Sequence, residues 1–150
     1  MDAFDVQVAA FDELDVRTAY LIWQLREAVF VVEQHCPYPE LDGRDLEPAT
    51  RHLWVADDGR PVGYLRILDD RLAARIGRVA VAATHRGRGV ASLMMQRAHA
   101  QTAGRPTVLD AQSYLAHWYA GLGYERTGPE FLDDGIPHVP MRRDALIGSG

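Results

Sequence analysis

The sequence predicts a mixed α/β (α+β) sheet flanked by helices, rather than a doubly wound parallel sheet. Three observations support this fold class. The expected elements follow one another as β-α-β-β-β-α-β-α-β-β, and runs of strands interrupt the alternation that a doubly wound fold requires. An Asp-Gly pair at positions 58–59 joins two apolar runs, which is typical of a tight hairpin. At residues 76–103 an apolar strand ends in an Arg/Gly turn that leads directly into an amphipathic helix.

The elements of the N-terminal half follow from periodicity and punctuation. Alternating residues predict a short strand at 4–8. A helix from residue 15 to about 32 carries an apolar stripe from Leu21 to Val32, and Asp12 or Asp15 can cap it. Residues 33–50 are polar and contain three prolines, so we expect a long loop that is functional or mobile. The hairpin strands at 52–56 and 62–68 come next, followed by a strand at 75–82.

The C-terminal half alternates between helices and strands. The Arg/Gly turn opens a helix at 89–103, and Arg105-Pro106 precedes a strand at 107–111. A short helix at 115–122 ends at Gly123. Two further strands at 124–127 and 136–142 complete the sheet, with Gly128-Pro129 and Asp134-Gly135 as turn signals between them.

Composition places the chain among globular intracellular proteins. Its 150 residues suit one domain over 1–150, and no apolar run or leader pattern indicates a membrane span or a signal peptide, so we expect a cytoplasmic protein. The net charge of −5 argues against a general nucleic-acid binder. The single cysteine, Cys36, excludes an intramolecular disulfide, and its spacing from His35 and His52 fits no common zinc pattern, so we expect no metal.

The turn at residues 86–91 is the strongest functional signal. Strand, glycine-rich turn and helix together aim the unpaired N–H groups of a first helical turn at one point, where the helix dipole also favours negative charge. A dinucleotide site needs G-x-G-x-x-G, and a P-loop needs a Lys-Ser/Thr pair. The chain has neither, because all sixteen of its Lys and Arg residues are arginine. The turn therefore predicts a phosphate-bearing ligand held by backbone N–H groups or guanidinium groups.

The segment from Arg78 to Ala91 resembles motif A of the GNAT N-acetyltransferases, (Gln/Arg)-x-x-Gly-x-(Gly/Ala). The segment 115–124, Leu-Ala-His-Trp-Tyr-Ala-Gly-Leu-Gly-Tyr, resembles the second half of that fold and follows in the same order. Over residues 4–143 the chain is similar to the ElaA-type branch of the superfamily. The resemblance implies an acyl-CoA N-acyltransferase fold, whose mixed sheet is splayed between its fourth and fifth strands.

The resemblance also implies how acetyl-CoA, the donor, would bind. The pyrophosphate would lie on the backbone of the turn, and the pantetheine arm would pair with the backbone of the preceding strand and enter the gap beside the strand that ends at Gln112. The implied cofactor-binding residues are Val79, Ala80, Val81, Arg86, Gly87, Arg88, Gly89, Val90, Ala91, Gln112 and Tyr119. An N–H group near Val81 would stabilise the oxyanion that forms when the thioester is attacked.

Catalytic roles follow the same resemblance. Tyr119 matches the tyrosine that protonates the leaving thiolate, although its helix face is also that of a core tyrosine. For the general base, the leading candidates are His138 in the last strand and Glu33 at the end of the first helix. Other candidates stay open: His52, Glu40, Asp42 and His117.

The expected activity is transfer of an acetyl group to a primary amine by direct attack within a ternary complex. Acidic residues in the 33–45 loop favour a cationic acceptor, unless they cap turns or pair with Arg44 and Arg51. The alternative is a non-catalytic acyl-CoA-binding or interaction module on the same fold. Partners are acetyl-CoA and an amine, with a possible homodimer, and neither nucleic acid nor membrane.

Overall fold

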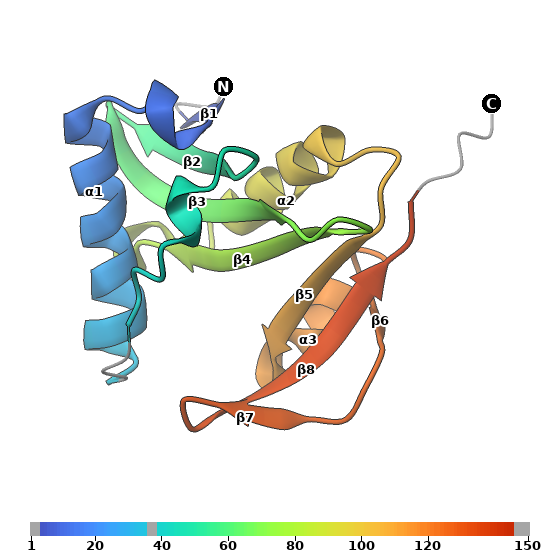
Figure 1. The fold of residues 1–150 in the computed structure, drawn as a ribbon. Helices are drawn as coiled ribbons and strands as arrows, with labels where there is room; N and C mark the ends of the chain where they lie inside the picture. The colour runs from blue at the N-terminus through green and yellow to red at the C-terminus, as the bar shows by residue number, and fades with distance from the viewer. Residues whose placement is uncertain (1–3, 36–38, 146–150) are drawn as a thin grey trace.

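The computed structural model describes residues 4–35 and 39–145, and its centre is one mixed sheet (Figure 1). The strands are β1 (Phe4–Ala9), β2 (Arg51–Asp57), β3 (Arg60–Asp69), β4 (Ala74–Val81), β5 (Thr107–Gln112), β6 (Glu125–Arg126), β7 (Phe131–Asp133) and β8 (Ile136–Arg143). Their order in the sheet is β1-β2-β3-β4-β5-β8-β6, and β7 pairs with β8. The predicted fold class is confirmed.

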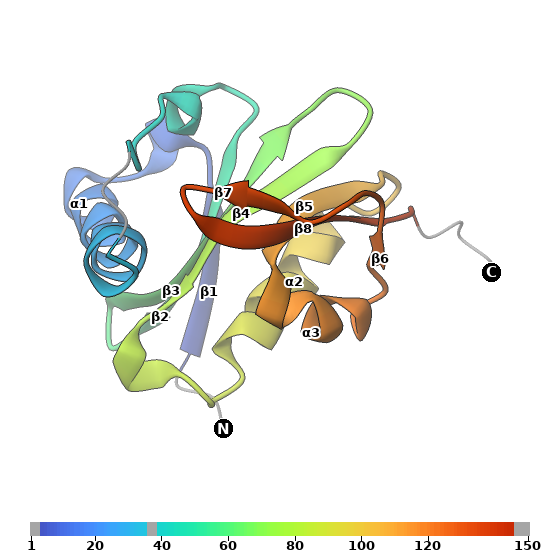
Figure 2. The same cartoon turned by 90° about the horizontal axis from the view of Figure 1, so that it is seen from below.

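The helices cover opposite faces of this sheet (Figure 2). Helix α1 (Val16–Arg26) packs on β3 and β4 from one side. Helices α2 (Val90–Gln101) and α3 (Ala116–Ala120) lie on the other side, against β2–β4 and β5 respectively. No helix within the described residues is long and apolar enough to cross a membrane.

Two local predictions hold in detail. Asp15 caps α1, because its carboxylate accepts a hydrogen bond from the Thr18 N–H at 2.8 Å. Asp58 and Gly59 join β2 to β3 with φ values of 54° and 76°, as a two-residue hairpin of the primed type requires.

The first helix departs from its prediction. After Arg26 it widens into a π-helical segment, η2 (Glu27–Glu33), rich in β-branched residues that crowd an α-helix. The buried face contains Ile22, Arg26 and Phe30, whereas Val32 at the end of the predicted stripe is 63% exposed. The predicted stripe is therefore right at Leu25 and Val29, which are buried, and wrong at Val32, because the buried face shifts toward Arg26 and Phe30 where the helix widens.

The predicted C-terminal elements also change in part. The helix expected at 115–122 is a 3-10 turn, η5 (Ser113–Leu115), followed by the short α3. Strand β7 was not predicted, and Asp134 and Gly135 connect it to β8 with φ values of 50° and 79°. This hairpin extends past the end of β5 (Figure 1).

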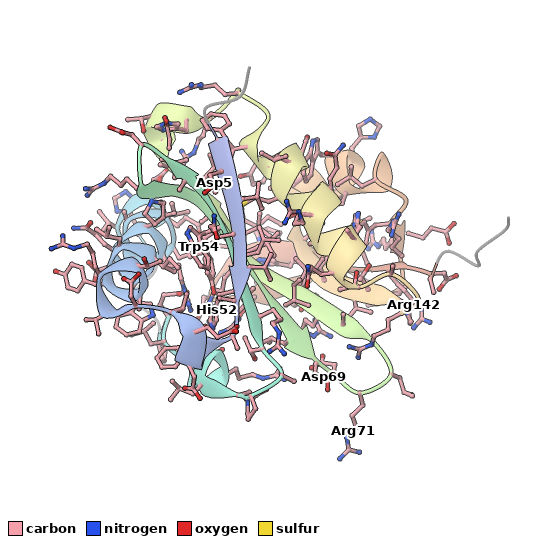
Figure 3. All side chains as sticks on the ribbon, turned by 90° about the horizontal axis from the view of Figure 1, so that it is seen from above. Asp5, His52, Trp54, Asp69, Arg71 and Arg142 are labelled. Atoms are coloured by element: carbon pink, nitrogen blue, oxygen red, sulfur yellow. The ribbon has the colours of Figure 1, made fainter. Side chains whose placement is uncertain are left out.

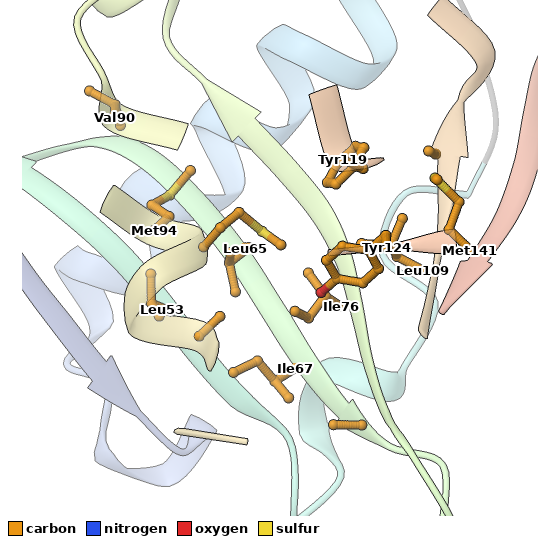
Figure 4. Close-up of a cluster of buried hydrophobic side chains, with 14 of the residues drawn as sticks. Leu53, Leu65, Ile67, Ile76, Val90, Met94, Leu109, Tyr119, Tyr124 and Met141 are labelled. Atoms are coloured by element: carbon orange, nitrogen blue, oxygen red, sulfur yellow. The ribbon is translucent and has the colours of Figure 1, made fainter. Parts of the chain in front are cut away.

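The main core lies between the sheet and α2 (Figure 4). It contains Leu53, Leu65, Ile76, Met94, Leu109, Tyr119 and Tyr124, all buried. Helix α2 approaches β3 closely at Gly63, where an added Cβ would lie 2.5 Å from Val90 Cγ1. This close contact fixes the start of α2, and with it the Arg/Gly turn, relative to the sheet.

Strands β4 and β5 are parallel but pair only at one end. Their registered pairs are Ala74 with Thr107 and Arg75 with Val108, and beyond these the strands diverge (Figure 1). The splay expected between the fourth and fifth strands is therefore present. It leaves backbone groups of both strands without a ladder partner on their facing sides.

Candidate active site

The Arg/Gly turn has the geometry of an anion site. Gly87 and Gly89 have φ values of 73° and 79°, which side-chain-bearing residues rarely adopt, and an added Cβ at either position would meet no atom within 4 Å. Gly89 is the N-cap of α2 and has no side chain to cap it, and the residues of the first helical turn border a pocket. This pocket at the turn, the turn pocket, has among its lining residues Val81, Arg86, Gly87, Val90, Ala91 and Trp118.

The strand before the turn presents its backbone to the β4–β5 gap. The Ala82 N–H donates to Val62 O at 2.8 Å, so by antiparallel alternation the backbone groups of Val81 point away from β3. The Nε of Arg86 donates to Val81 O at 3.1 Å, on the side of the gap. Ala80 pairs with Tyr64, and its backbone groups point toward β3. Val81 thus has its backbone directed at the gap, whereas Ala80 does not.

A second pocket, the inner pocket, lies at the gap between β4 and β5. Among its lining residues are the predicted Val79, Gln112, Tyr119 and His138. They come from β4, β5, α3 and β8, so the splay brings together side chains that are far apart in the sequence. Gln112 and His138 are registered partners across β5 and β8.

Tyr119 is 6% exposed and lies between two aromatic rings, Trp118 at 5.0 Å and Tyr124 at 5.9 Å between centroids. Burial, reinforced by the neighbouring Tyr124 and Tyr114, raises the pKa of Tyr119 to about 12. The hydroxyl is therefore protonated at neutral pH. Because Trp118 lines the turn pocket and Tyr119 the inner pocket, α3 joins the two.

His138 has a defined tautomer. Its Nδ1 lies 2.7 Å from Ile136 O, and a carbonyl only accepts, so Nδ1 carries a proton, and in the neutral ring the lone pair is on Nε2. The ring stacks on Phe131, with 5.9 Å between centroids and an interplanar angle of 24°. The histidine is therefore oriented by its own hairpin, in the same pocket as Tyr119.

Glu33 is placed elsewhere. At the end of η2 its carboxylate forms a two-pronged ion pair with the guanidinium of Arg86, through Nη1 and, at 2.8 Å, through Nη2. Hydrogen bonding from Arg86 lowers the pKa of Glu33, which makes it a weak base. The structure thus brings Glu33 to the turn and not to Tyr119 and His138.

The acidic loop faces arginines that the sequence did not suggest as partners. Buried Arg26 pairs with Glu40 and, at 2.8 Å, with Asp45; Arg66 pairs with Asp42 at 2.6 Å and with Asp45 at 3.1 Å. Hydrogen bonds from Arg66 hold the pKa of Asp42 far below its usual range. These carboxylates are neutralised within the fold, which removes the support for a cationic acceptor drawn from the loop.

The expected local pairings hold in part. Asp42 caps a turn, because its carboxylate accepts from the Arg44 N–H at 3.1 Å, whereas Arg44 pairs with Glu47, outside the 33–45 range, at 3.0 Å and Arg51 donates to backbone carbonyls of Pro48 and Thr50. Sequence reasoning missed the inner pocket's basic floor of Arg66, Arg75 and Arg78 on β3 and β4. The signal was present, because arginine inside an apolar strand run is unusual unless it is paired.

The remaining base candidates lie outside this pocket. His52 is buried on β2 beside the end of β1 (Figure 3), where its Nε2 donates to Asp45 O at 3.0 Å and its Nδ1 accepts from the Tyr64 hydroxyl at 2.6 Å. His117 is exposed on α3. Cys36 lies outside the described residues. Among residues 4–35 and 39–145, no cluster of three or more His, Cys, Asp or Glu side chains could hold a metal ion.

Comparisons with known proteins agree on one family. A family model described as an acetyltransferase (GNAT) domain matches residues 17–145. The chain is 47% identical to a UPF0039 protein of Mycobacterium tuberculosis over 143 residues, covering 92% of this chain and 90% of the relative. It is 38% identical to protein ElaA of Escherichia coli over 141 residues, covering 89% and 92%. A solved acyl-CoA N-acyltransferase from Pseudomonas aeruginosa superposes with a TM-score of 0.89 at 37% identity, covering 93% and 99%.

Proposed function

The chain belongs to the GNAT acetyltransferase family, and on that premise we propose that it transfers an acetyl group from acetyl-CoA to a primary amine by direct attack in a ternary complex. One observation carries the proposal: a buried, protonated tyrosine and the backbone of β4 share a pocket at the inner end of a gap that leads to an anion-binding turn.

Donor binding uses backbone groups at both ends of the gap. The pyrophosphate lies on the N–H groups of residues 86–91, where Gly87 and Gly89 leave the approach open. The pantetheine arm then runs between β4 and β5 and takes up ladder groups that the splay leaves unpaired. This course brings the thioester to Val79 and Tyr119.

The transfer step forms a C–N bond and breaks a C–S bond. The neutral amine attacks the thioester carbonyl, and a β4 N–H near Val81 stabilises the oxyanion that develops. When the tetrahedral intermediate collapses, the electron pair leaves on sulfur, and Tyr119 gives its proton to the thiolate. The nitrogen gives up its surplus proton, which passes through solvent to the Tyr119 phenolate, so that the products are an amide, free CoA thiol and the regenerated phenol.

His138 is the better candidate for the base that first deprotonates the ammonium form of the acceptor. Its Nε2 lone pair is available within the pocket, whereas the Glu33 carboxylate is held by Arg86. Either residue acts before the attack, because an ammonium group has no electron pair with which to attack the thioester.

The test is CoA thiol release with a panel of primary amines, comparing the wild type with Tyr119→Phe. We expect turnover with at least one amine and a loss of about tens- to hundredfold in kcat for the variant. Tyr20→Phe, which removes the hydroxyl of a tyrosine that is 62% exposed on α1, is the matched control and should keep full activity. Tight acetyl-CoA binding without turnover of any amine would instead favour a non-catalytic acyl-CoA-binding module.

A further inference from the structure

Strand β4 contains a bulge in an unusual backbone conformation. Its register with β3 shifts between the pairs Arg66–Gly77 and Tyr64–Ala80, so Arg78 and Val79 together lie opposite one residue, Leu65. Arg78 has a φ of 55°, in the left-handed region where such bulges usually have glycine. Gly77 stands one position earlier in the sequence, yet the strained position belongs to an arginine. A conformation of this kind persists where the surroundings fix it.

The contacts of the Arg78 side chain with the loop after η2 fix this conformation. Its Nε lies 2.6 Å from Glu40 Oε1, and its Nη2 donates to the Glu40 backbone carbonyl at 3.1 Å. A longer contact of 3.5 Å reaches Asp42 Oδ2. The guanidinium is thus held by side-chain and backbone oxygens of the loop that follows η2, and both Arg78 and Val79 line the inner pocket.

Glu40 is itself fixed from behind. It is 7% exposed and also pairs with Arg26, which is fully buried and lies over the Tyr64 ring at 5.3 Å from its centroid. Tyr64 is the registered partner of Ala80, two residues beyond Arg78 on β4. A closed circuit of contacts therefore runs from β4 through the loop and α1 to β3 and back to β4.

We propose that Arg78 and Glu40 are positioning residues, whose ion pair holds the β4 bulge in the conformation in which the backbone of Val79 and Val81 receives the pantetheine arm and the thioester. This inference rests on the proposed function. It assigns the acidic loop a role in donor binding through β4, in place of a charge that attracts the acceptor. Neither side chain needs to touch the donor.

The test compares two ligands on the same protein samples by titration calorimetry or competition. Acetyl-CoA reaches both the turn and the bulge, whereas 3′-phospho-ADP, the nucleotide half of coenzyme A, reaches only the turn. Arg78→Gly removes the side chain and adopts a positive φ without strain, so it should fold. We expect it to weaken acetyl-CoA binding about tenfold. Its affinity for 3′-phospho-ADP should stay within about twofold of the wild type.

Glu40→Gln breaks the same contact from the loop and should act in the same direction. The losses in the double variant should be less than additive, because both substitutions break the Arg78–Glu40 ion pair, while Glu40→Gln also affects the pair with Arg26. Glu47→Gln is the matched control, since Glu47 pairs with Arg44 on the same loop and does not line the inner pocket. It should leave both affinities unchanged.

Equal weakening of the two ligands would indicate a purely structural role and would overturn the inference, as would additive losses in the double variant or unchanged acetyl-CoA binding by Arg78→Gly. A wild-type protein that binds 3′-phospho-ADP and acetyl-CoA but acetylates no amine would overturn the proposed catalysis and leave the positioning role standing. A wild-type protein that binds neither ligand would overturn both.

Discussion

Tyr119 is suited to its proposed role by burial. With a pKa of about 12 the hydroxyl keeps its proton over the whole range in which the protein is expected to work. We therefore expect kcat to show no falling limb from this group between about pH 7 and about pH 10. A pH–rate profile of the wild type checks this. A fall in kcat near pH 9 that is absent from Tyr119→Phe would show that the phenol titrates early and would contradict the assignment.

Substitutions of His138 and of Glu33 should affect different steps, the first kcat and the second acetyl-CoA binding. Because His138 has a free Nε2 in the inner pocket, His138→Gln should lower kcat by about a hundredfold, with a small effect on acetyl-CoA affinity. Glu33→Gln weakens the contact with Arg86 and should change acetyl-CoA binding more than the chemical step. Steady-state kinetics at saturating acetyl-CoA separates the two effects. A large kcat loss in Glu33→Gln alone would assign the base to Glu33.

At the scale of elements, the turn before α2 gives the sharpest prediction. Gly89→Glu adds a Cβ where φ is 79° and places a negative charge at the proposed pyrophosphate site. We expect acetyl-CoA binding to weaken by more than about a hundredfold, as measured by calorimetry. Gly59→Glu is the matched control, because Gly59 has a φ of 76° but lies in the β2–β3 turn. Unchanged affinity in Gly89→Glu would remove the phosphate assignment.

Elements whose cause is local could be predicted from the sequence. The Asp58-Gly59 hairpin, the Asp15 cap and the strand-turn-helix at Gly89 each depend on neighbouring residues. The π-helical widening after Arg26 depends on competition between helix types, and the three residues of β7 are too few to show a period, although the Asp134-Gly135 turn that joins β7 to β8 is local. Patterns of period 2 or 3.6 contain no information on these.

The same division holds within the candidate site. The turn and Tyr119 could be predicted as candidates, because each belongs to a motif made of consecutive residues. Arg66 and Arg78 could be singled out as unusual inside apolar strands, but their partners could not be predicted, because Asp42 and Glu40 reach them only when the loop folds back. Glu33 was assigned a role from its position at the end of a helix, and its contact with Arg86 spans 53 residues.

For the molecule as a whole, buried His52 and half-buried His99 make stability depend on pH. Burial lowers the pKa of His52, and it lowers that of His99 to about 4, where the Nε2 of His99 lies 2.8 Å from the Tyr124 hydroxyl. The hydroxyl accepts from Thr107 and so donates to an unprotonated His99. In the unfolded chain a histidine titrates near 6.5, so that between about pH 6.5 and about pH 4 the unfolded state binds more protons.

These histidines should therefore not lower the free energy of unfolding above about pH 6.5. The free energy of unfolding should fall as the pH decreases from about 6.5 toward about 4. Urea unfolding at several pH values measures this. His99→Gln removes one titrating group and should flatten the dependence, even if the variant is less stable at neutral pH. An equally steep dependence in His99→Gln would exclude His99 as a cause.

The two registered pairs that join β4 to β5 have a further consequence, for association between molecules. A strand edge with unpaired N–H and C=O groups normally invites another chain to add to the sheet, and proteins protect such edges. Here two unpaired edges face each other inside the molecule, beyond Ala74–Thr107 and Arg75–Val108. Because these two edges face each other and not outward, neither offers an open side to which a strand of another molecule would normally add, whereas a slender, unbranched amide chain brings no side chains into the gap. The splay thus leaves backbone groups for a small ligand without turning an unpaired edge outward.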